Sequence, residues 1–130
     1  MNLLLDTHVF IWAQAEPEQL KPDARIAIAN PENRVLVSLV TAWELSIKIG
    51  LGKPMVLPPN VGTWFTSTLE RGGLEFAPIE LQHVTAVEHL PLHHRDPFDR
   101  LLIAQARAER LTLVTRDRRF APYDVHILWT

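Results

Sequence analysis

Short apolar runs that lie between helical patterns constrain the fold of this chain more than any other feature. The runs 2–5, 35–39 and 111–115 are apolar on both faces, and Asp6 ends the first of them abruptly. Strands of this kind are typical of a buried parallel sheet. Parallel neighbours need long crossover connections, which are usually helices. The sequence therefore predicts an α/β fold with a parallel or mostly parallel sheet and helices on both faces.

Helical patterns occupy the segments between these runs. We predict further strands at 74–79 and 124–129, and helices over 22–30, 41–49, 61–70, 80–90 and 96–110. The start of the last helix is the best marked, because Asp96 suits the N-cap, Pro97 the first helical position and Asp99 the third. The proline-rich segment 53–60 is predicted to be a loop.

Length and composition indicate a single domain, residues 1–130. A chain of 130 residues with 47% hydrophobic residues can bury a core, and the absence of cysteine excludes disulfides and zinc–thiolate sites. The net charge of -2 argues against a uniformly basic nucleic-acid-binding surface. The apolar start, residues 1–15, has no Lys or Arg before it and is interrupted by Asp6, unlike a signal peptide or a membrane span. We therefore expect a cytoplasmic protein with no membrane contact.

Four acidic residues are expected at the same edge of the predicted sheet. Asp6 directly follows the first strand, and Asp117 follows the strand 111–115 after one residue. Glu44 and Asp99 lie in the first turns of predicted helices that begin near the same edge. The carboxyl ends of the strands in an open parallel sheet form its usual ligand-binding crevice. We therefore expect these four side chains to converge.

Converging carboxylates indicate a metal site. They repel one another, so at neutral pH they either hold protons or bind a cation. Oxygen ligands, with neither cysteine nor a spaced histidine pair, favour Mg²⁺ or Mn²⁺. Such an ion can activate water against a phosphodiester, which makes hydrolysis of nucleic acid a reasonable function. Taken singly, each acid also has a structural explanation, as a helix cap or, for Glu44, as an i,i+4 partner of Lys48.

Histidines and tryptophans near these acids have simpler explanations. His8, His93 and His94 lack i,i+4 ligand spacing, and the loop before Asp96 is expected to be exposed, so we predict neither a zinc site nor a histidine base. The four tryptophans are expected in the core or in an interface: Trp12, Trp43, Trp64 and Trp129.

The chain resembles the PIN-domain ribonucleases, and among them the VapC-type toxins of prokaryotic toxin–antitoxin pairs. The resemblance covers nearly the whole chain and runs through LLDTHVFIWA, VSLVTAWELSIKIGLGK, LPLHHRDPFDRLLIAQA and LTLVTRDRRFAPYDVHILW. It implies a three-layer α/β/α fold and a divalent-metal endoribonuclease whose products carry a 5′-phosphate and a 3′-hydroxyl. It also implies a homodimer and a cognate VapB-like antitoxin whose C-terminal segment wraps the toxin. We expect a short antitoxin reading frame beside the gene.

The resemblance also implies roles for the four acids. Asp6, Asp99 and Asp117 match the acids that bind the metal ion, and Glu44 matches the acid that ligates it or orients and deprotonates the attacking water. Asp99 is chosen over Asp96 because its 18-residue separation from Asp117 fits the pattern of the family, and Asp96 is assigned to the N-cap.

Three further residues are candidates for the same site. Thr7 and Ser38 carry small hydroxyls that could orient a metal-binding carboxylate or a water, or could simply bond the local backbone. Arg116 is a candidate contact for an RNA phosphate, because it neighbours Asp117.

Two other functions are consistent with parts of this pattern. A catalytically silent module could use the same acidic pocket to hold RNA or a protein, although the complete acid set argues against it. A phosphatase with Asp6 as its nucleophile is a further alternative, but the sequence Asp6-Thr7-His8 lacks the second acid of a D-x-D motif. No motif in the sequence specifies which RNA would be cut.

Overall fold

A single five-stranded parallel sheet lies at the centre of the molecule. The computed structural model describes residues 1–54 and 60–130, so most of the predicted loop 53–60 lies outside the described residues. The strand order is β3-β2-β1-β4-β5, and each neighbouring pair is parallel. The strands are β1 (Asn2–Leu5), β2 (Arg34–Ser38), β3 (Glu75–Ala77), β4 (Thr112–Thr115) and β5 (Ile127–Trp129). The predicted α/β class and parallel sheet are confirmed.

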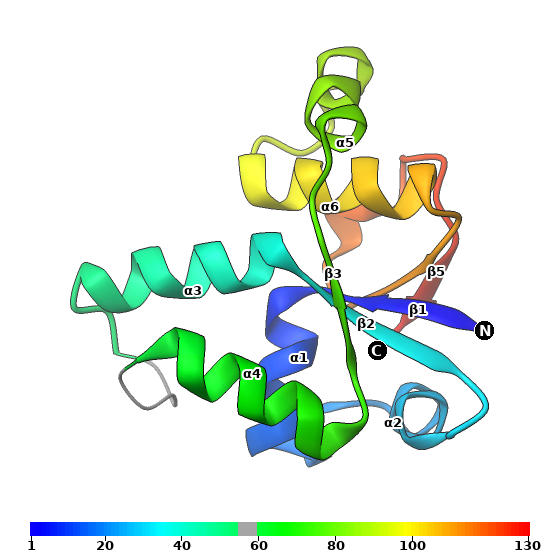
Figure 1. Ribbon diagram of the computed structural model, residues 1–130. Coiled ribbons are helices and arrows are strands. Elements are labelled where there is room, and N and C mark those ends of the chain that lie inside the picture. Colours follow the sequence, from blue (N-terminus) through cyan, green and yellow to red (C-terminus); the bar gives the residue numbers. More distant parts are fainter. Residues whose placement is uncertain (55–59) are drawn as a thin grey trace.

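Helices cover both faces of this sheet, which gives the three layers seen in Figure 1. The helices are α1 (Thr7–Ala15), α2 (Pro22–Ala29), α3 (Leu39–Gly50), α4 (Val61–Gly72), α5 (Leu81–Ala86) and α6 (Pro97–Ala108). Short 3₁₀ turns also occur in the described residues: η1 (Pro17–Gln19), η2 (Val87–His89) and η3 (Arg118–Phe120). None of the helices in the described part of the chain is long and apolar enough to cross a membrane.

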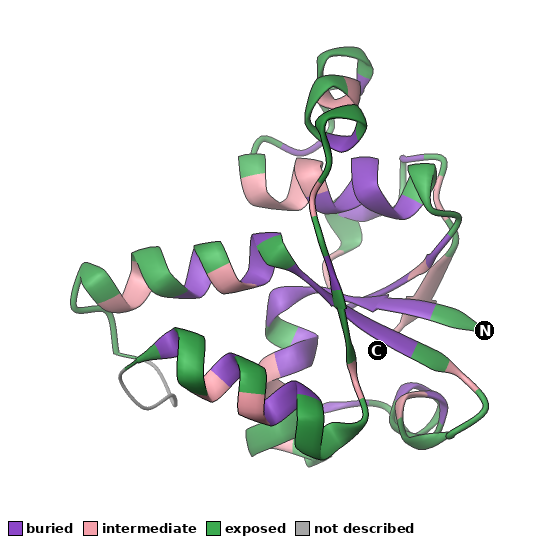
Figure 2. Cartoon of the chain, viewed as in Figure 1, coloured by how far each residue is buried: buried purple, intermediate pink, exposed green. Residues whose placement is uncertain are grey.

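Alternation along the central strand divides the core between the two faces. Leu3 and Leu5 of β1 pack with side chains of α1, α2 and α4, whereas Leu4 packs with side chains of α6 and of the segment around η3. All three leucines are fully buried, and Figure 2 shows the buried colour running along the inner strands. Since successive side chains of a strand point to opposite faces, a strand covered on both sides must be apolar throughout.

Helix α1 is the main element that the sequence does not predict. Its segment THVFIWAQA is apolar at most positions, so polar residues do not recur with the helical period. Thr7, Val9 and Phe10 are buried in the structure. A helix that packs against the sheet and other helices needs little polar surface, so periodicity cannot reveal it. Another difference is that α3 begins at Leu39, which was predicted to end the preceding strand.

Candidate functional residues lie at or just after the carboxyl ends of the strands. Asp6 follows β1 and is the N-cap of α1, while Ser38 ends β2 and is the N-cap of α3. Asp117 comes two residues after the end of β4 and is the N-cap of η3. One edge of the sheet therefore carries several polar side chains from distant parts of the sequence.

Candidate functional site

Asp6 is buried at the end of the central strand. One of its oxygens accepts a hydrogen bond from the backbone amide of Val9 at 2.9 Å, and the other accepts one from the hydroxyl of Thr115. Burial raises the pKa of Asp6 above its usual value, and the hydrogen bonds from Thr115 and Val9 oppose that rise. The capping role and the position at the sheet edge are therefore combined in one residue.

Glu44 is buried in α3, and both of its oxygens are held. The hydroxyl of Thr7 donates to Oε1 at 2.7 Å, and the ammonium of Lys48 donates to Oε2 at 2.7 Å. Thr7 thereby connects the first turn of α1 to α3. The sequence predicts that Glu44 lies in the first turn of its helix. Because α3 begins at Leu39, Glu44 lies in the second turn instead.

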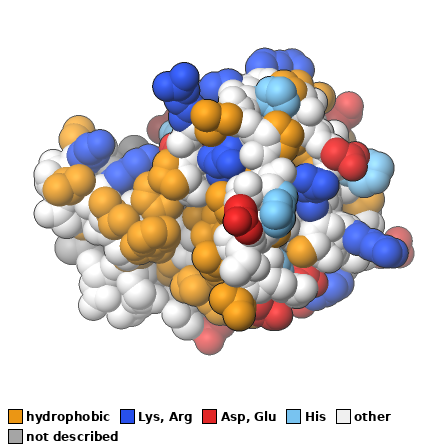
Figure 3. Space-filling model, turned by 90° about the horizontal axis from the view of Figure 1, so that it is seen from above, with side chains coloured by type: hydrophobic (Ala, Val, Ile, Leu, Met, Phe, Trp, Pro, Cys, Tyr) orange, Lys and Arg blue, Asp and Glu red, His pale blue; other side chains and the backbone are white. Residues whose placement is uncertain are grey.

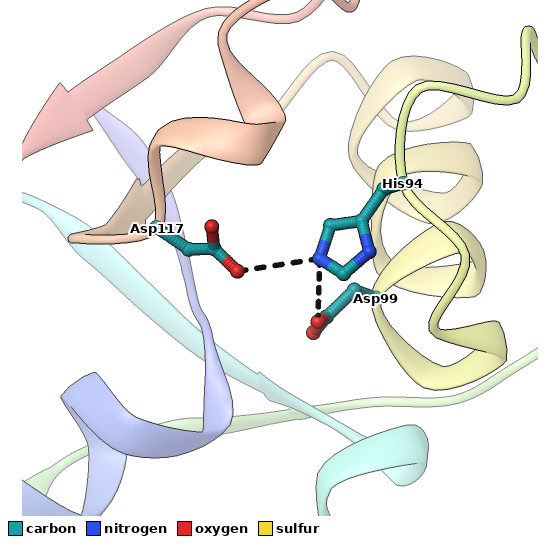
Figure 4. Close-up of side chains that lie close together, drawn as sticks. All are labelled: His94, Asp99 and Asp117. Atoms are coloured by element: carbon teal, nitrogen blue, oxygen red, sulfur yellow. Dashed lines mark hydrogen bonds and ion pairs between the residues drawn. The ribbon is translucent and has the colours of Figure 1, made fainter.

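Asp99 and Asp117 meet at the side chain of His94, as Figure 4 shows. Nε2 of His94 lies 2.9 Å from Oδ2 of Asp99 and 3.2 Å from Oδ2 of Asp117. Asp99 belongs to the first turn of α6, whereas Asp117 follows β4. One ligand-capable atom from each of these three residues lies within 4.8 Å of the others.

The position of His94 corrects the sequence analysis, which expected an exposed loop before Asp96. His94 is 1% exposed, because its ring packs against Phe120 and its backbone is tied to Tyr123. No local signal marks this residue, since its partners lie 5 and 23 positions further along the chain. Only the fold brings them together.

The pKa of Asp99 depends on burial and on the charges of the other acids. Its pKa is raised to about 8, first by burial and then by the negative charges of Asp96, Asp6, Glu44 and Asp117. Three acids that are distant from Asp99 in sequence, Asp6, Glu44 and Asp117, are thus close enough in space to disfavour its ionised form. Asp99 and Asp117 have oxygens within 4.8 Å of each other, whereas a single site formed by all four acids stays a prediction.

Asp117 has the opposite electrostatic environment. The side chain of Arg119 donates hydrogen bonds to both carboxylate oxygens, the shortest at 2.7 Å. These bonds are the first cause that lowers the pKa of Asp117, to about 2, and His94 adds a smaller contribution. Asp117 therefore stays ionised at neutral pH while Asp99, in the same cluster, holds a proton.

Asp96, Ser38 and Arg116 make hydrogen bonds with the backbone. Asp96 accepts a hydrogen bond from the amide of Phe98 at 2.8 Å, which confirms its predicted role as the N-cap of α6. Ser38 accepts one from the amide of Val40 at 3.0 Å, a local backbone bond. In the described chain, the guanidinium of Arg116 bonds the carbonyls of Gln19 and Thr130 and lies 4.3 Å from the centre of the Trp12 ring.

This donor set fits a hard divalent cation. Mg²⁺ and Mn²⁺ prefer carboxylate oxygens and retain several waters, and the site offers several carboxylates without a thiolate. A cation placed among them would offset the negative charges that, after burial, raise the pKa of Asp99. Asp6, Asp99 and Asp117 come from separate elements, and among them Asp99 and Asp117 have oxygens within 4.8 Å of each other.

Comparison with known proteins returned a family and several similar structures. The PIN domain profile matches residues 3–125. Comparison with curated proteins returned no significant match. VapBC2 from Rickettsia felis, bound to a DNA fragment from its promoter, has a chain that superposes with a TM-score of 0.73 at 18% identity, over 99% of this chain and 98% of that one.

Two further solved structures give the same result. DNA-bound VapBC from Salmonella typhimurium superposes with a TM-score of 0.69 at 19% identity, over 99% of this chain and 98% of that one. VapBC-1 from nontypeable Haemophilus influenzae gives a TM-score of 0.64 at 18% identity, over 98% of this chain and 97% of that one. At these identities the likeness establishes a shared fold over whole chains.

Proposed function

Because the chain belongs to the PIN domain family, we propose that it is a Mg²⁺- or Mn²⁺-dependent endoribonuclease of the VapC toxin type. The observation that carries the proposal is the meeting of Asp99, from α6, and Asp117, from the end of β4, whose carboxylate oxygens lie within 4.8 Å of each other. Burial first, and then nearby negative charges that include those of Asp6, Glu44 and Asp117, raise the pKa of Asp99. Such a cluster is costly without a cation, and a cation held by carboxylates is suited to phosphodiester hydrolysis.

The acids take different roles in this proposal. Asp6, Asp99 and Asp117 hold the metal ion, which when bound lowers the pKa of a coordinated water and offsets phosphate charge. Glu44 ligates the ion or orients the attacking water and accepts its proton. Thr7 and Lys48 hold the two oxygens of Glu44, so that its carboxylate keeps one orientation. Cleavage is expected to leave a 5′-phosphate and a 3′-hydroxyl.

Two further polar residues, the exposed Arg116 and the buried Ser38, are proposed to contribute to the site. Arg116 is exposed beside Asp117 and is proposed to contact an RNA phosphate, with its guanidinium supported by the ring of Trp12. The hydroxyl of Ser38 accepts a backbone hydrogen bond but can still donate its own proton to a water or a carboxylate.

A VapB-like antitoxin is the proposed protein partner. An apolar groove of about 490 Å³ runs between α3, α4 and β3, and Val61, Phe65 and Leu69 contribute to its lining. A groove of this kind can hold an apolar segment of a partner chain. The antitoxin is also expected to carry an Arg or Lys that reaches the acids and competes with the metal ion.

A homodimer is proposed from the exposed apolar face of α3. Leu39, Trp43 and Ile47 lie four residues apart along this helix and are 43%, 55% and 37% exposed. Figure 3 shows hydrophobic side chains gathered on the side of the molecule where Figure 1 places α3. Contiguous exposed apolar surface of this kind is typical of a protein interface.

The test of the proposed activity is cleavage of labelled RNA by the purified protein. We expect cleavage with Mg²⁺ or Mn²⁺, none with EDTA, and none with Asp99→Asn. RNA that is bound but never cut, with either ion, would instead favour a catalytically silent binding module.

A further inference from the structure

His94 stands between two of the proposed metal-binding acids without belonging to either of their elements. Its Nε2 hydrogen-bonds to Oδ2 of Asp117 at 3.2 Å and lies 2.9 Å from Oδ2 of Asp99. Figure 4 shows the edge of the imidazole ring facing both carboxyl groups. The side chain of His94 is 0% exposed, whereas those of Asp99 and Asp117 are 18% and 23% exposed. The nitrogen therefore points into the acidic cluster from the protein side.

The loop that carries His94 is fixed by several contacts. The hydroxyl of Tyr123 accepts hydrogen bonds from the backbone amides of His93 and His94, at 3.1 and 2.8 Å, and donates to the carbonyl of Pro91 at 2.7 Å. The ring of His94 packs against Phe120 with 5.3 Å between the ring centres. These contacts leave the imidazole little freedom to turn away from the acids.

The backbone amide of Asp96 determines which ring nitrogen of His94 carries the proton. This amide donates a hydrogen bond to Nδ1 at 3.2 Å, so Nδ1 is the acceptor. In a neutral imidazole the proton then sits on Nε2. A protonated Nε2 has no lone pair to offer a metal ion, but it can donate to a carboxylate oxygen that keeps a second lone pair for the ion.

We propose that His94 is a positioning residue, whose Nε2–H holds the oxygens of Asp99 and Asp117 in place for the metal ion without ligating it. This inference rests on the proposed function, because it takes these two carboxylates as metal ligands. The two acids come from α6 and from the end of β4, and their charges repel once Asp99 loses its proton to bind the ion. A donor fixed between them offsets that repulsion and keeps both oxygens within reach of one ion. Partners of this kind are worth roughly 10- to 100-fold in metal affinity.

His83 provides a matched control at a distance from the acids. It is 1% exposed, its Nδ1 accepts a hydrogen bond from the amide of Glu80 at 3.0 Å, and its Nε2 lies 2.8 Å from Oε1 of Glu109. The same substitution at His83 and at His94 removes the same ring from the same kind of environment. A difference in metal binding between the two variants then reports the contact of His94 with Asp99 and Asp117.

The experiment measures Mn²⁺ binding by calorimetry in the absence of RNA, with circular dichroism and metal-free melting as checks of folding. We expect His94→Leu to weaken Mn²⁺ binding by roughly 10- to 100-fold. His94→Gln should bind Mn²⁺ nearly as well as the wild type, because its amide can place an N–H donor near the position of Nε2. His83→Leu should melt earlier but bind Mn²⁺ with unchanged affinity.

A spectroscopic measurement separates a positioning role from ligation. The electron spin-echo spectrum of Mn²⁺ bound to the wild-type protein should show no directly coordinated imidazole nitrogen. A coordinated nitrogen, unchanged binding in His94→Leu, or an equal loss in His83→Leu would each overturn the proposal. Mn²⁺ binding is measured independently of cleavage. If the wild type binds Mn²⁺ at these acids but never cuts RNA, the proposed function is contradicted and the role of His94 is not. A wild type that binds no Mn²⁺ contradicts both.

Discussion

Among the acids of the cluster, Asp99 has its pKa raised to about 8, by burial and by its charged neighbours. With a pKa of about 8 it holds its proton at neutral pH in the metal-free protein, whereas Asp117, with a pKa of about 2, is ionised. A metal ion that binds to both must displace the proton of Asp99. We therefore expect Mn²⁺ affinity to increase as the pH rises toward 8.

Asp99→Asn removes a proposed ligand while keeping the shape of the side chain. We expect it to abolish cleavage, by at least about 100-fold, because an amide oxygen is a much poorer ligand for Mg²⁺ than a carboxylate. Asp23→Asn serves as the control, since Asp23 lies in the first turn of α2 and is exposed. Initial rates of RNA cleavage at saturating Mn²⁺ measure the effect. Full activity in Asp99→Asn would remove this residue from the site.

The stability of the metal-free protein should fall as the pH rises from about 4 to 8. The folded-state pKa of Asp99 lies above its ordinary value of 3.8, so in this range the folded protein binds more protons than the unfolded chain. Its stabilising contribution is fully present below pH 4 and is lost as the pH passes through 8. The raised pKa of Asp6 acts in the same direction, whereas Asp117 contributes only at lower pH.

Asp99→Asn provides the comparison for this pH dependence. The variant should melt at a temperature similar to that of the wild type below pH 4 and at a higher one at pH 8, because it has no buried carboxyl group to ionise. Melting in EDTA at several pH values measures both curves. Parallel curves for the two proteins would show that Asp99 does not carry the pH dependence.

The residues of the site differ in how far the sequence can reveal them. Asp6 and Asp117 could be predicted because each follows a strand, and strand ends meet at one edge of a parallel sheet. Glu44 and Asp99 could be predicted because their helices begin near that edge. His94 could not, because its burial depends on Phe120 and Tyr123, which reach it through the tertiary fold alone.

At the level of elements, the start of α6 positions Asp99. Asp96 accepts hydrogen bonds from the amides of Phe98 and Asp99, and Pro97 occupies the first helical position. Asp96→Ala should therefore reduce the free energy of unfolding by about 1 kcal/mol. Asp96→Asn keeps a capping oxygen and should cost much less. Urea unfolding at pH 5 measures both, and equal losses in the two variants would contradict the capping role.

The elements themselves could be predicted where a period or a cap exists. Helix α6 has its cap and proline, and the apolar runs of β1 and β4 match the strands closely. Helix α1 has a cap residue, Asp6, but its segment THVFIWAQA lacks an alternation of apolar and polar residues with the helical period. The helix predicted over 80–90 ends at Ala86 and continues as the 3₁₀ turn η2.

For the whole molecule, the exposed face of α3 predicts the oligomeric state. We expect the wild-type protein to sediment as a dimer at micromolar concentration and Trp43→Lys to sediment as a folded monomer, because a charge would be buried in the interface. Ile26→Lys on α2 is the control, since Ile26 is 67% exposed and Trp43 is 55% exposed. A monomeric wild type, or a dimer that persists in Trp43→Lys, would exclude this face as the interface.

The four acids come from the ends of β1 and β4 and from α3 and α6, and the proposed function requires that they share one ion. A crystal structure of the protein with Mn²⁺, with an anomalous difference map, tests this most directly. We predict one or more Mn²⁺ peaks within about 2.5 Å of carboxylate oxygens of Asp6, Asp99 and Asp117. The absence of a peak among these carboxylates at saturating Mn²⁺, or acids that point into separate regions, would contradict the account.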